Sequence, residues 1–181
     1  GDSNLRARFY VSASGSSGTL AAGDYLKEYL NTQIAVVEAT ECPTLLYNGY
    51  GEHNIQGIGD KHVPLIHNVM NTDFVVGISE KATNNLNMVF NTEIGQKYLI
   101  NKKGFEKNFI NRLPEFGFST IANILASIKI AKYMNLGSND AIITVATDGA
   151  DLYLSELNKT KEEFIGIYDE SSCAEIIGQY L

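Results

Sequence analysis

The stretch that most constrains the fold is RFYVSASGSSGTLAAGDYLKEYL, residues 8–30. Phe9, Val11 and Ala13 alternate with small or polar residues, which is the two-residue period of a strand. Residues 15–19, GSSGT, interrupt this period, and apolar residues then recur at the three- and four-residue steps of a helix. The stretch therefore predicts a strand, a glycine-serine loop and a helix.

A glycine-serine loop between a strand and a helix has the chemistry of an anion site. Its backbone N–H groups and hydroxyls face the space before the helix, and the positive end of the helix dipole lies beside them. Phosphate is the anion that such a site favours most, whereas the alternative is a tight turn that binds nothing. We therefore expect the loop to bind a phosphate group.

The remaining chain alternates predicted strands and predicted helices. Apolar runs predict buried strands at residues 34–38, 73–78 and 141–146. Helical spacing predicts helices at residues 79–90, 93–100 and 119–135. Residues 42–50 are expected to be irregular, residues 51–64 to form a glycine-rich loop, and the tail from residue 151 to be helical in pieces with a capping box at Thr160.

This alternation predicts an α/β fold of three layers, with helices on both faces of a mainly parallel sheet. Ligands of such sheets bind beyond the carboxyl ends of the strands. Residues 15–19, the turn after Glu38 and the segment after Ala146 should all lie at that edge.

Length and charge narrow the class of protein. The chain of 181 residues fits a single domain, and its net charge of −7 argues against a nucleic-acid-binding surface. It contains no apolar run that could cross a bilayer, and its two distant cysteines match no zinc or redox spacing. We expect a cytoplasmic protein without membrane or nucleic-acid partners, and the start at Gly1 suggests a piece of a longer protein.

Several ligand classes can be weighed from the residues. Glu38 lies where a dinucleotide-binding domain carries its ribose-binding acid, although the first loop lacks G-x-G-x-x-G spacing. A P-loop is excluded because no lysine follows Gly18. His53, His62 and His67 match no metal motif, and a Ser-His-Asp triad stays open because triads are spatial.

Five segments, in order, resemble motifs of the fold-type II pyridoxal-phosphate enzymes, the group that includes cysteine synthase, cystathionine β-synthase and the tryptophan synthase β subunit. They are GSSGTLAAGDYLKE, HNIQGIGDKHVP, DFVVGISEKA, GFSTIAN and VATDGADLYLS. The first is similar to the family's G-T-G-G-T loop and its helix, and the second to its H-x-I-x-G-I-G loop. The resemblance covers about residues 8–155.

The resemblance implies that residues 1–157 are the domain that binds the phosphate of pyridoxal 5′-phosphate, followed by a helical extension at 158–181. The family's Schiff-base lysine lies upstream, in an S-x-K-[DEN]-R motif that is absent here. By this resemblance the chain alone is expected to be inactive. The whole enzyme is expected to be a homodimer that catalyses β-replacement or β-elimination on an amino acid, with a sulfur nucleophile or leaving group. The alternatives are a non-catalytic module that binds a ligand or partner protein, and a nucleotide-binding oxidoreductase domain.

The resemblance also assigns roles to individual residues. The phosphate would be bound by Gly15, Ser16, Ser17, Gly18 and Thr19. The face of the cofactor would be lined by Gly57, Ile58 and Gly59, with Asp60 and Lys61 toward the substrate. Ser119 would hydrogen-bond the pyridine nitrogen. A hydroxyl, unlike a carboxylate, does not force that nitrogen to be protonated. The alternative is that Ser119 is only the N-cap of its helix. Asp148, at the end of the last predicted strand, would contact the residues that bind the cofactor.

Overall fold

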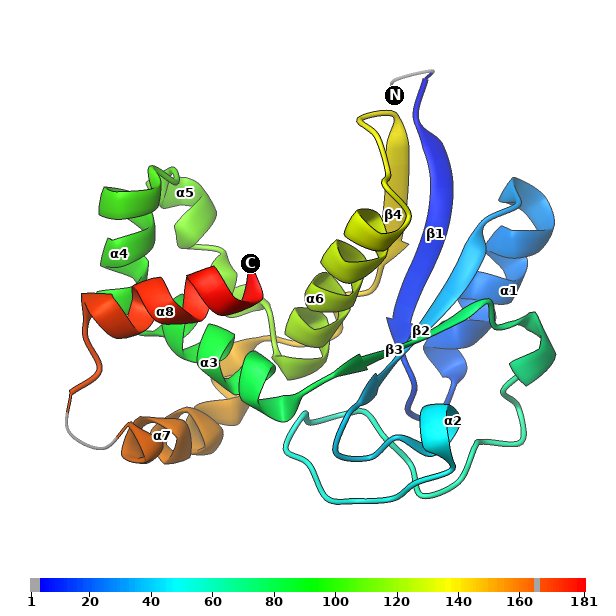
Figure 1. Ribbon diagram of the computed structural model, residues 1–181, viewed down its shortest axis with the longest axis horizontal. Coiled ribbons are helices and arrows are strands. Elements are labelled where there is room, and N and C mark those ends of the chain that lie inside the picture. Colours follow the sequence, from blue (N-terminus) through cyan, green and yellow to red (C-terminus); the bar gives the residue numbers. More distant parts are fainter. Residues whose placement is uncertain (1–3, 165–166) are drawn as a thin grey trace.

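The computed structural model describes residues 4–164 and 167–181, and its centre is a parallel sheet of four strands (Figure 1). The strands are β1 (Arg6–Ala13), β2 (Gln33–Ala39), β3 (Phe74–Ile78) and β4 (Asp140–Thr144). They lie in the order β3-β2-β1-β4, and all three pairings are parallel. The chain therefore moves outward from β1 to β3 and returns to the far side of β1 for β4.

Helices cover both faces of this sheet. The helices of the described residues are α1 (Gly18–Leu30), α2 (Thr44–Tyr47), α3 (Glu80–Asn91), α4 (Glu93–Lys103), α5 (Lys107–Ile110), α6 (Phe118–Tyr133), α7 (Leu154–Glu163) and α8 (Glu170–Tyr180). Short 3-10 turns lie at Val69–Asn71, Leu113–Glu115 and Ala150–Tyr153. Because the β1–β2 and β3–β4 crossovers run in opposite directions, right-handed connections place α1 and α6 on opposite faces. Figure 1 shows this arrangement, with α3, α4, α5 and α8 beyond α6, and the predicted α/β fold is confirmed.

The alternation in β1 separates two hydrophobic cores. Phe9, Val11 and Ala13 belong to the larger core, on the side of α6, and Phe9 is fully buried. The smaller core, on the side of α1, consists of Leu20, Ile34 and Val36. A hydrophobic core therefore lies on each face of the sheet at β1, as expected for a central strand of a covered parallel sheet.

The two outer strands differ from the prediction of fully buried strands. Most residues of β3 and β4 are only partly buried, and Thr144 is exposed. Each of these strands has a hydrogen-bonded neighbour on one side only within the described residues. The apolar composition predicted the strands correctly, but strand order, which the local sequence does not encode, determines how deeply each is buried.

Local predictions in the tail and near residue 44 also need correction. Thr160 does not begin a helix: it lies in the last turns of α7, and its hydroxyl donates to the Glu156 carbonyl at 2.9 Å. The capping box is instead at Asp169, whose carboxylate accepts from the N–H groups of Ser171 and Ser172. The segment 42–50 contains the single turn α2, and the proposed boundary after residue 157 lies within α7 and stays a prediction.

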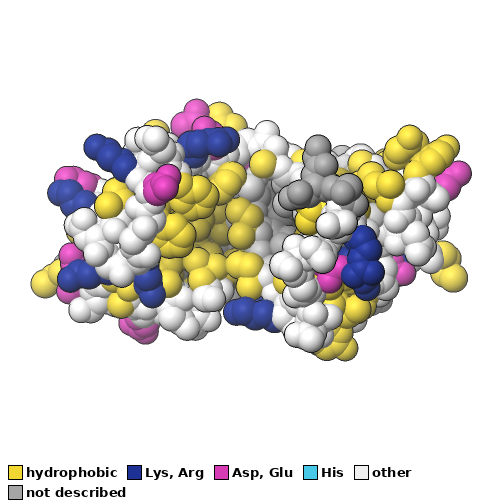
Figure 2. Space-filling view, turned by 90° about the horizontal axis from the view of Figure 1, so that it is seen from above, with side chains coloured by type: hydrophobic (Ala, Val, Ile, Leu, Met, Phe, Trp, Pro, Cys, Tyr) yellow, Lys and Arg dark blue, Asp and Glu magenta, His cyan; other side chains and the backbone are white. Residues whose placement is uncertain are grey.

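Figure 2 views the end of the molecule at the amino ends of the strands, where hydrophobic side chains gather on the half formed by the helices beyond α6. Phe105, Phe109 and Leu181 of these helical segments are each about half exposed. Among the helices that the structure describes, none combines the length and the hydropathy needed to span a membrane.

Candidate functional site

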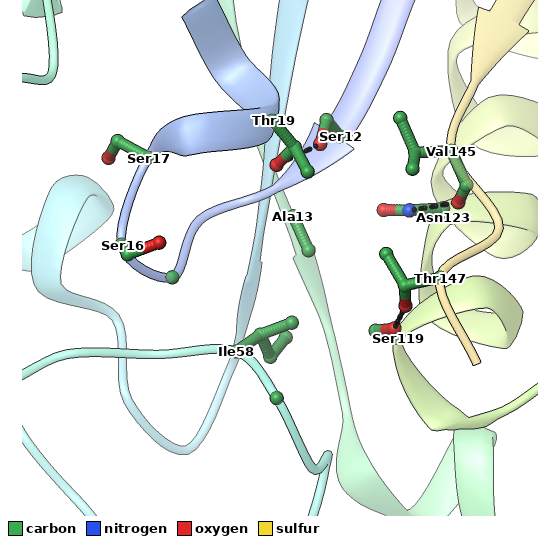
Figure 3. Close-up of a pocket in the computed structure, with 12 residues that line it drawn as sticks. Ser12, Ala13, Ser16, Ser17, Thr19, Ile58, Ser119, Asn123, Val145 and Thr147 are labelled. Carbon is green, nitrogen blue, oxygen red and sulfur yellow. Dashed lines mark hydrogen bonds between the residues drawn. The ribbon is translucent and has the colours of Figure 1, made fainter.

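A pocket lies at the carboxyl edge of the sheet, between the ends of β1 and β4 (Figure 3). Strand order reverses between these two strands, and such a switch point is where open α/β sheets bind ligands. The cavity has a volume of about 100 Å³. It is lined by Ser12, Ala13, Gly15, Ser16, Ser17, Thr19, Gly57, Ile58, Ser119, Asn123, Val145 and Thr147.

The loop at residues 15–19 forms one wall of the pocket and leads into α1. In the described part of the chain, the backbone N–H groups of these five residues donate no hydrogen bond to protein atoms. Two contacts hold the loop in place: the Tyr10 hydroxyl donates to the Thr19 carbonyl at 2.6 Å, and the Ser12 hydroxyl to Thr19 Oγ1 at 2.9 Å. Burial raises the pKa of Tyr10, so this phenol stays a donor. The loop thus offers a fixed set of free donors at the positive end of a helix.

Ser16 and Ser17 point in different directions. Figure 3 shows the Ser16 side chain directed toward the pocket and the Ser17 side chain directed away from it. Ser17 has a φ of 66°, in the left-handed region, and its buried hydroxyl has no hydrogen-bond partner among the described residues. The hydroxyl of Ser17 therefore lies outside the pocket, and only its backbone can take part in the predicted anion site.

We expect Ser17→Gly to stabilise the protein by about 1 kcal/mol. The change removes a left-handed non-glycine residue, which costs roughly 1–2 kcal/mol, and offsets that gain by the added freedom of glycine in the unfolded chain. Urea unfolding of both proteins measures the difference. The matched control is Ser16→Gly, which has no positive φ to relieve and should lower stability slightly. A Ser17→Gly variant that is less stable than the unmodified protein would contradict the backbone strain inferred at Ser17.

The glycine-rich loop at residues 57–59 approaches the first loop closely. The Gly59 N–H donates to the Ser14 carbonyl at 2.7 Å, and a Cβ on Gly15 would lie 3.1 Å from the Gly57 carbonyl oxygen. Gly57 and Gly59 have φ values of 79° and 86°, which favour glycine. These positions let two main-chain segments meet at the pocket, with Ile58 in its lining.

The opposite wall is a line of hydrogen bonds that begins at Ser119. The Ser119 and Thr147 hydroxyls are 3.0 Å apart, and Thr147 Oγ1 donates to Asp148 Oδ1 at 3.3 Å. The Tyr153 hydroxyl donates to the other oxygen of Asp148. Burial, together with the hydrogen bond and charge of Asp148, raises the pKa of Tyr153 to about 12.

Ser119 is not the helix N-cap. Gly117 has that position, its N–H donates to the Asp148 carbonyl at 2.9 Å, and Ser119 is the second residue of α6. The hydroxyl of Ser119 is free of the helix end because it bonds with Thr147 instead. The segment after β4 therefore ties α6 to the pocket.

Asn123 is a pocket residue that the sequence did not reveal. It lies one turn beyond Ser119 on α6, is 2% exposed, and donates from Nδ2 to the Val145 carbonyl at 3.0 Å. Ser12, Ala13, Val145 and Thr147 were also missed. The four-residue spacing from Ser119 to Asn123 is a signal that could have been used, since both side chains share one face of a helix.

Several predicted residues lie around the pocket rather than in its lining, namely Gly18, Gly59, Asp60, Lys61 and Asp148. The Asp60 carbonyl accepts from the Thr44 hydroxyl at 2.8 Å, and the Lys61 ammonium lies 5.6 Å from the centre of the Tyr50 ring. Both side chains are exposed, so their role toward a substrate stays a prediction.

Glu38 does not fit the acid of a dinucleotide site. It is 3% exposed, and its two carboxylate oxygens accept from the N–H groups of Leu45 and Leu46 at 2.9 and 2.8 Å. Because the carboxylate already caps the start of α2, neither oxygen is directed to a ribose.

No family model matches the chain. The chain is 31% identical to cysteine synthase B of Campylobacter jejuni over 149 residues, which are 81% of this chain and 42% of that protein. It is 26% identical to the solved O-acetylserine dependent cystathionine beta-synthase from Helicobacter pylori, covering 84% of this chain and 43% of that one with a TM-score of 0.59. The chain is related to the fold-type II pyridoxal-phosphate enzymes.

The likeness to solved members of this enzyme group extends over nearly the whole chain. O-acetyl serine sulfhydrylase isoform 3 from Entamoeba histolytica matches 97% of this chain and 47% of its own, at 22% identity and a TM-score of 0.67, which shows a shared fold. The chain thus spans less than half the length of these pyridoxal-phosphate enzymes.

Proposed function

We propose that this chain is the domain that binds the cofactor phosphate of a cysteine-synthase-like enzyme, and that its cofactor is pyridoxal 5′-phosphate. The observation that carries the proposal is the loop at residues 15–19, which lines a pocket at the switch point of the sheet and whose N–H groups have no protein acceptor among the described residues. The kinship with cysteine synthase B supports the choice of cofactor.

The residues of the pocket fit such a cofactor. The N–H groups of the loop and the Ser16 hydroxyl would bind the phosphate. Ile58 and Thr147 also line the pocket, and none of its described lining residues is ionisable. Ser119 and Asn123 supply polar atoms at the opposite wall. When bound, pyridoxal phosphate supplies an electron sink for carbanion chemistry, while the protein orients it and excludes water.

The reaction proposed for the whole protein is β-replacement or β-elimination on an amino acid, with a sulfur nucleophile or a sulfur leaving group. Its Schiff-base lysine would come from a domain outside this chain, and the active form would be a homodimer. The chain alone is then expected to be inactive. The C. jejuni relative, a cysteine synthase by name, supports this direction.

A second candidate is a module that binds a phosphorylated ligand without catalysis. It is favoured by one observation: among the described residues that line the pocket, none is ionisable. A pocket of this kind can bind a phosphate through N–H groups but offers no side chain for acid–base chemistry.

The test of the proposed function is a titration with pyridoxal 5′-phosphate and with inorganic phosphate, followed by amide NMR. We expect the N–H signals of residues 15–19 to shift with both ligands. Ser16→Glu should weaken the binding at least about fivefold, because like charges about 4 Å apart repel by roughly 1–4 kcal/mol between water and a protein surface.

The matched control is Ser171→Glu, which adds the same charge at an exposed position in the first turn of α8. It should leave both affinities unchanged. Ligand shifts confined to other segments would overturn the site, and binding of phosphate without any preference for pyridoxal phosphate would favour the non-catalytic module.

A further inference from the structure

The loop at residues 15–19 is fixed at its two ends. Hydrogen bonds to the Ser14 carbonyl, just before the loop, and to the carbonyl and hydroxyl oxygens of Thr19, its last residue, hold these ends in place. Ser17 lies between them with a left-handed backbone, and Figure 3 shows its side chain directed away from the pocket. The buried Ser17 hydroxyl therefore faces the side of the loop opposite the pocket.

A second, smaller cavity is also lined by Ser17. It lies between the start of α1 and residues 66–72, which precede β3, and its volume is about 10 Å³. Two atoms of its lining residues, Ser17 Oγ and His67 Nδ1, are buried without a hydrogen-bond partner in the part of the chain that the structure describes. A cavity of this size has room for about one water molecule, and a buried water needs at least two polar partners.

His67 is held in a fixed orientation at this cavity. It is 8% exposed, and its Nε2 lies 3.1 Å from Oγ1 of Thr72. Burial lowers the pKa of His67 more than the nearby Asp24 charge raises it, so the ring is neutral at pH 7. A neutral imidazole has one donor and one acceptor nitrogen, whereas a water and a serine hydroxyl can each donate and accept. One water can therefore bond to both His67 and Ser17 in either tautomer of the ring.

Residues 67–73 are themselves tied to α1 farther along the helix. The Asn71 side-chain amide donates to the Asp24 carboxylate. The Lys27 ammonium donates to the Asn71 carbonyl at 2.8 Å and to the Asp73 carboxylate at 2.7 Å. The segment thus runs beside α1 toward its first turn, where the small cavity lies. It can support the loop from the side opposite the pocket.

Resting on the proposed function, we propose that His67 is a positioning residue for the cofactor phosphate. One water bound between His67 Nδ1 and Ser17 Oγ links the middle of the loop to residues 67–73. The N–H groups of the loop are then held in place before the ligand arrives, so less ordering is required on binding. This role gives a reason for a serine at a left-handed position, because glycine lacks the hydroxyl that makes the link.

The experiment is a double-mutant cycle, measured by the affinities for pyridoxal 5′-phosphate and for inorganic phosphate. Ser17→Ala keeps the β-carbon and removes only the hydroxyl, and His67→Phe keeps a ring but removes both nitrogens. Each change should weaken both ligands about two- to tenfold, the effect of losing one hydrogen bond. The double variant should bind no more weakly than the weaker single variant, because both changes break the same link.

Ser17→Gly should weaken both ligands as well, although it is expected to gain stability. The two expectations agree because a water-mediated link adds little net stability once the entropy of the ordered water is counted. The matched control is His62→Phe, the same exchange at an exposed histidine that does not line the small cavity. It should leave both affinities unchanged.

The affinities of Ser17→Ala decide the case even if His67→Phe does not fold. If Ser17→Ala binds both ligands as tightly as the unmodified protein, or if the two losses multiply in the double variant, this inference is overturned. Shifted N–H signals at residues 15–19 would then leave the proposed function intact. If neither ligand shifts those signals, the proposed function fails, and the inference fails with it.

Discussion

Phe118→Ala should destabilise the protein by about 3–5 kcal/mol, the range for removing a fully buried aromatic side chain. Phe118 is 0% exposed and lies in the first turn of α6, within the larger core. Its ring packs edge-on against Tyr153, with 5.3 Å between the ring centres. The truncation thus leaves a cavity beside the residue that donates to Asp148.

The measurement is the midpoint of urea unfolding, compared with that of Phe109→Ala. Phe109 is 50% exposed and stacks on Phe105, so its removal leaves no enclosed cavity and should cost less than about 1 kcal/mol. Equal losses in the two variants would show that the start of α6 is not packed as described.

Regular patterns made the fold predictable from the sequence. In residues 8–30 the two-residue period, the glycines and the helical period succeed one another within one short stretch, so the strand, the loop and the first helix were all expected. These signals are local, and they depend on geometry that every strand and helix shares. The positions of the loops at one sheet edge followed from the rule that parallel strands end together.

The rest of the site depends on contacts between distant segments. Asn123 lies in a helix rich in apolar residues, and its role appears only where α6 crosses the end of β4 near Val145. Ser17 could be recognised as a loop residue, but the direction of its hydroxyl follows from a left-handed backbone. The motif at Thr160 resembled a cap, yet tertiary packing buries this residue inside α7.

Gly59→Ala should lower stability by about 2–5 kcal/mol, clearly more than the same change at Gly57. Both residues have positive φ values, 86° and 79°, so an alanine at either place costs roughly 1–2 kcal/mol. At Gly59 the new methyl group would also lie 2.4 Å from Nε2 of His53, and forcing the ring aside adds roughly 1–3 kcal/mol.

Gly57 is the matched control because a Cβ built there meets no atom within 4 Å, so only the backbone cost applies. Urea unfolding of the two variants measures the difference between them. The Gly59 N–H anchors its loop to Ser14, just before residues 15–19. If these residues bind the cofactor phosphate as proposed, Gly59→Ala should also weaken pyridoxal phosphate binding. Equal losses of stability at the two positions would mean that the His53 ring moves aside without cost. The packing of His53 against Gly59 would then not determine the position of the 57–59 loop at the pocket.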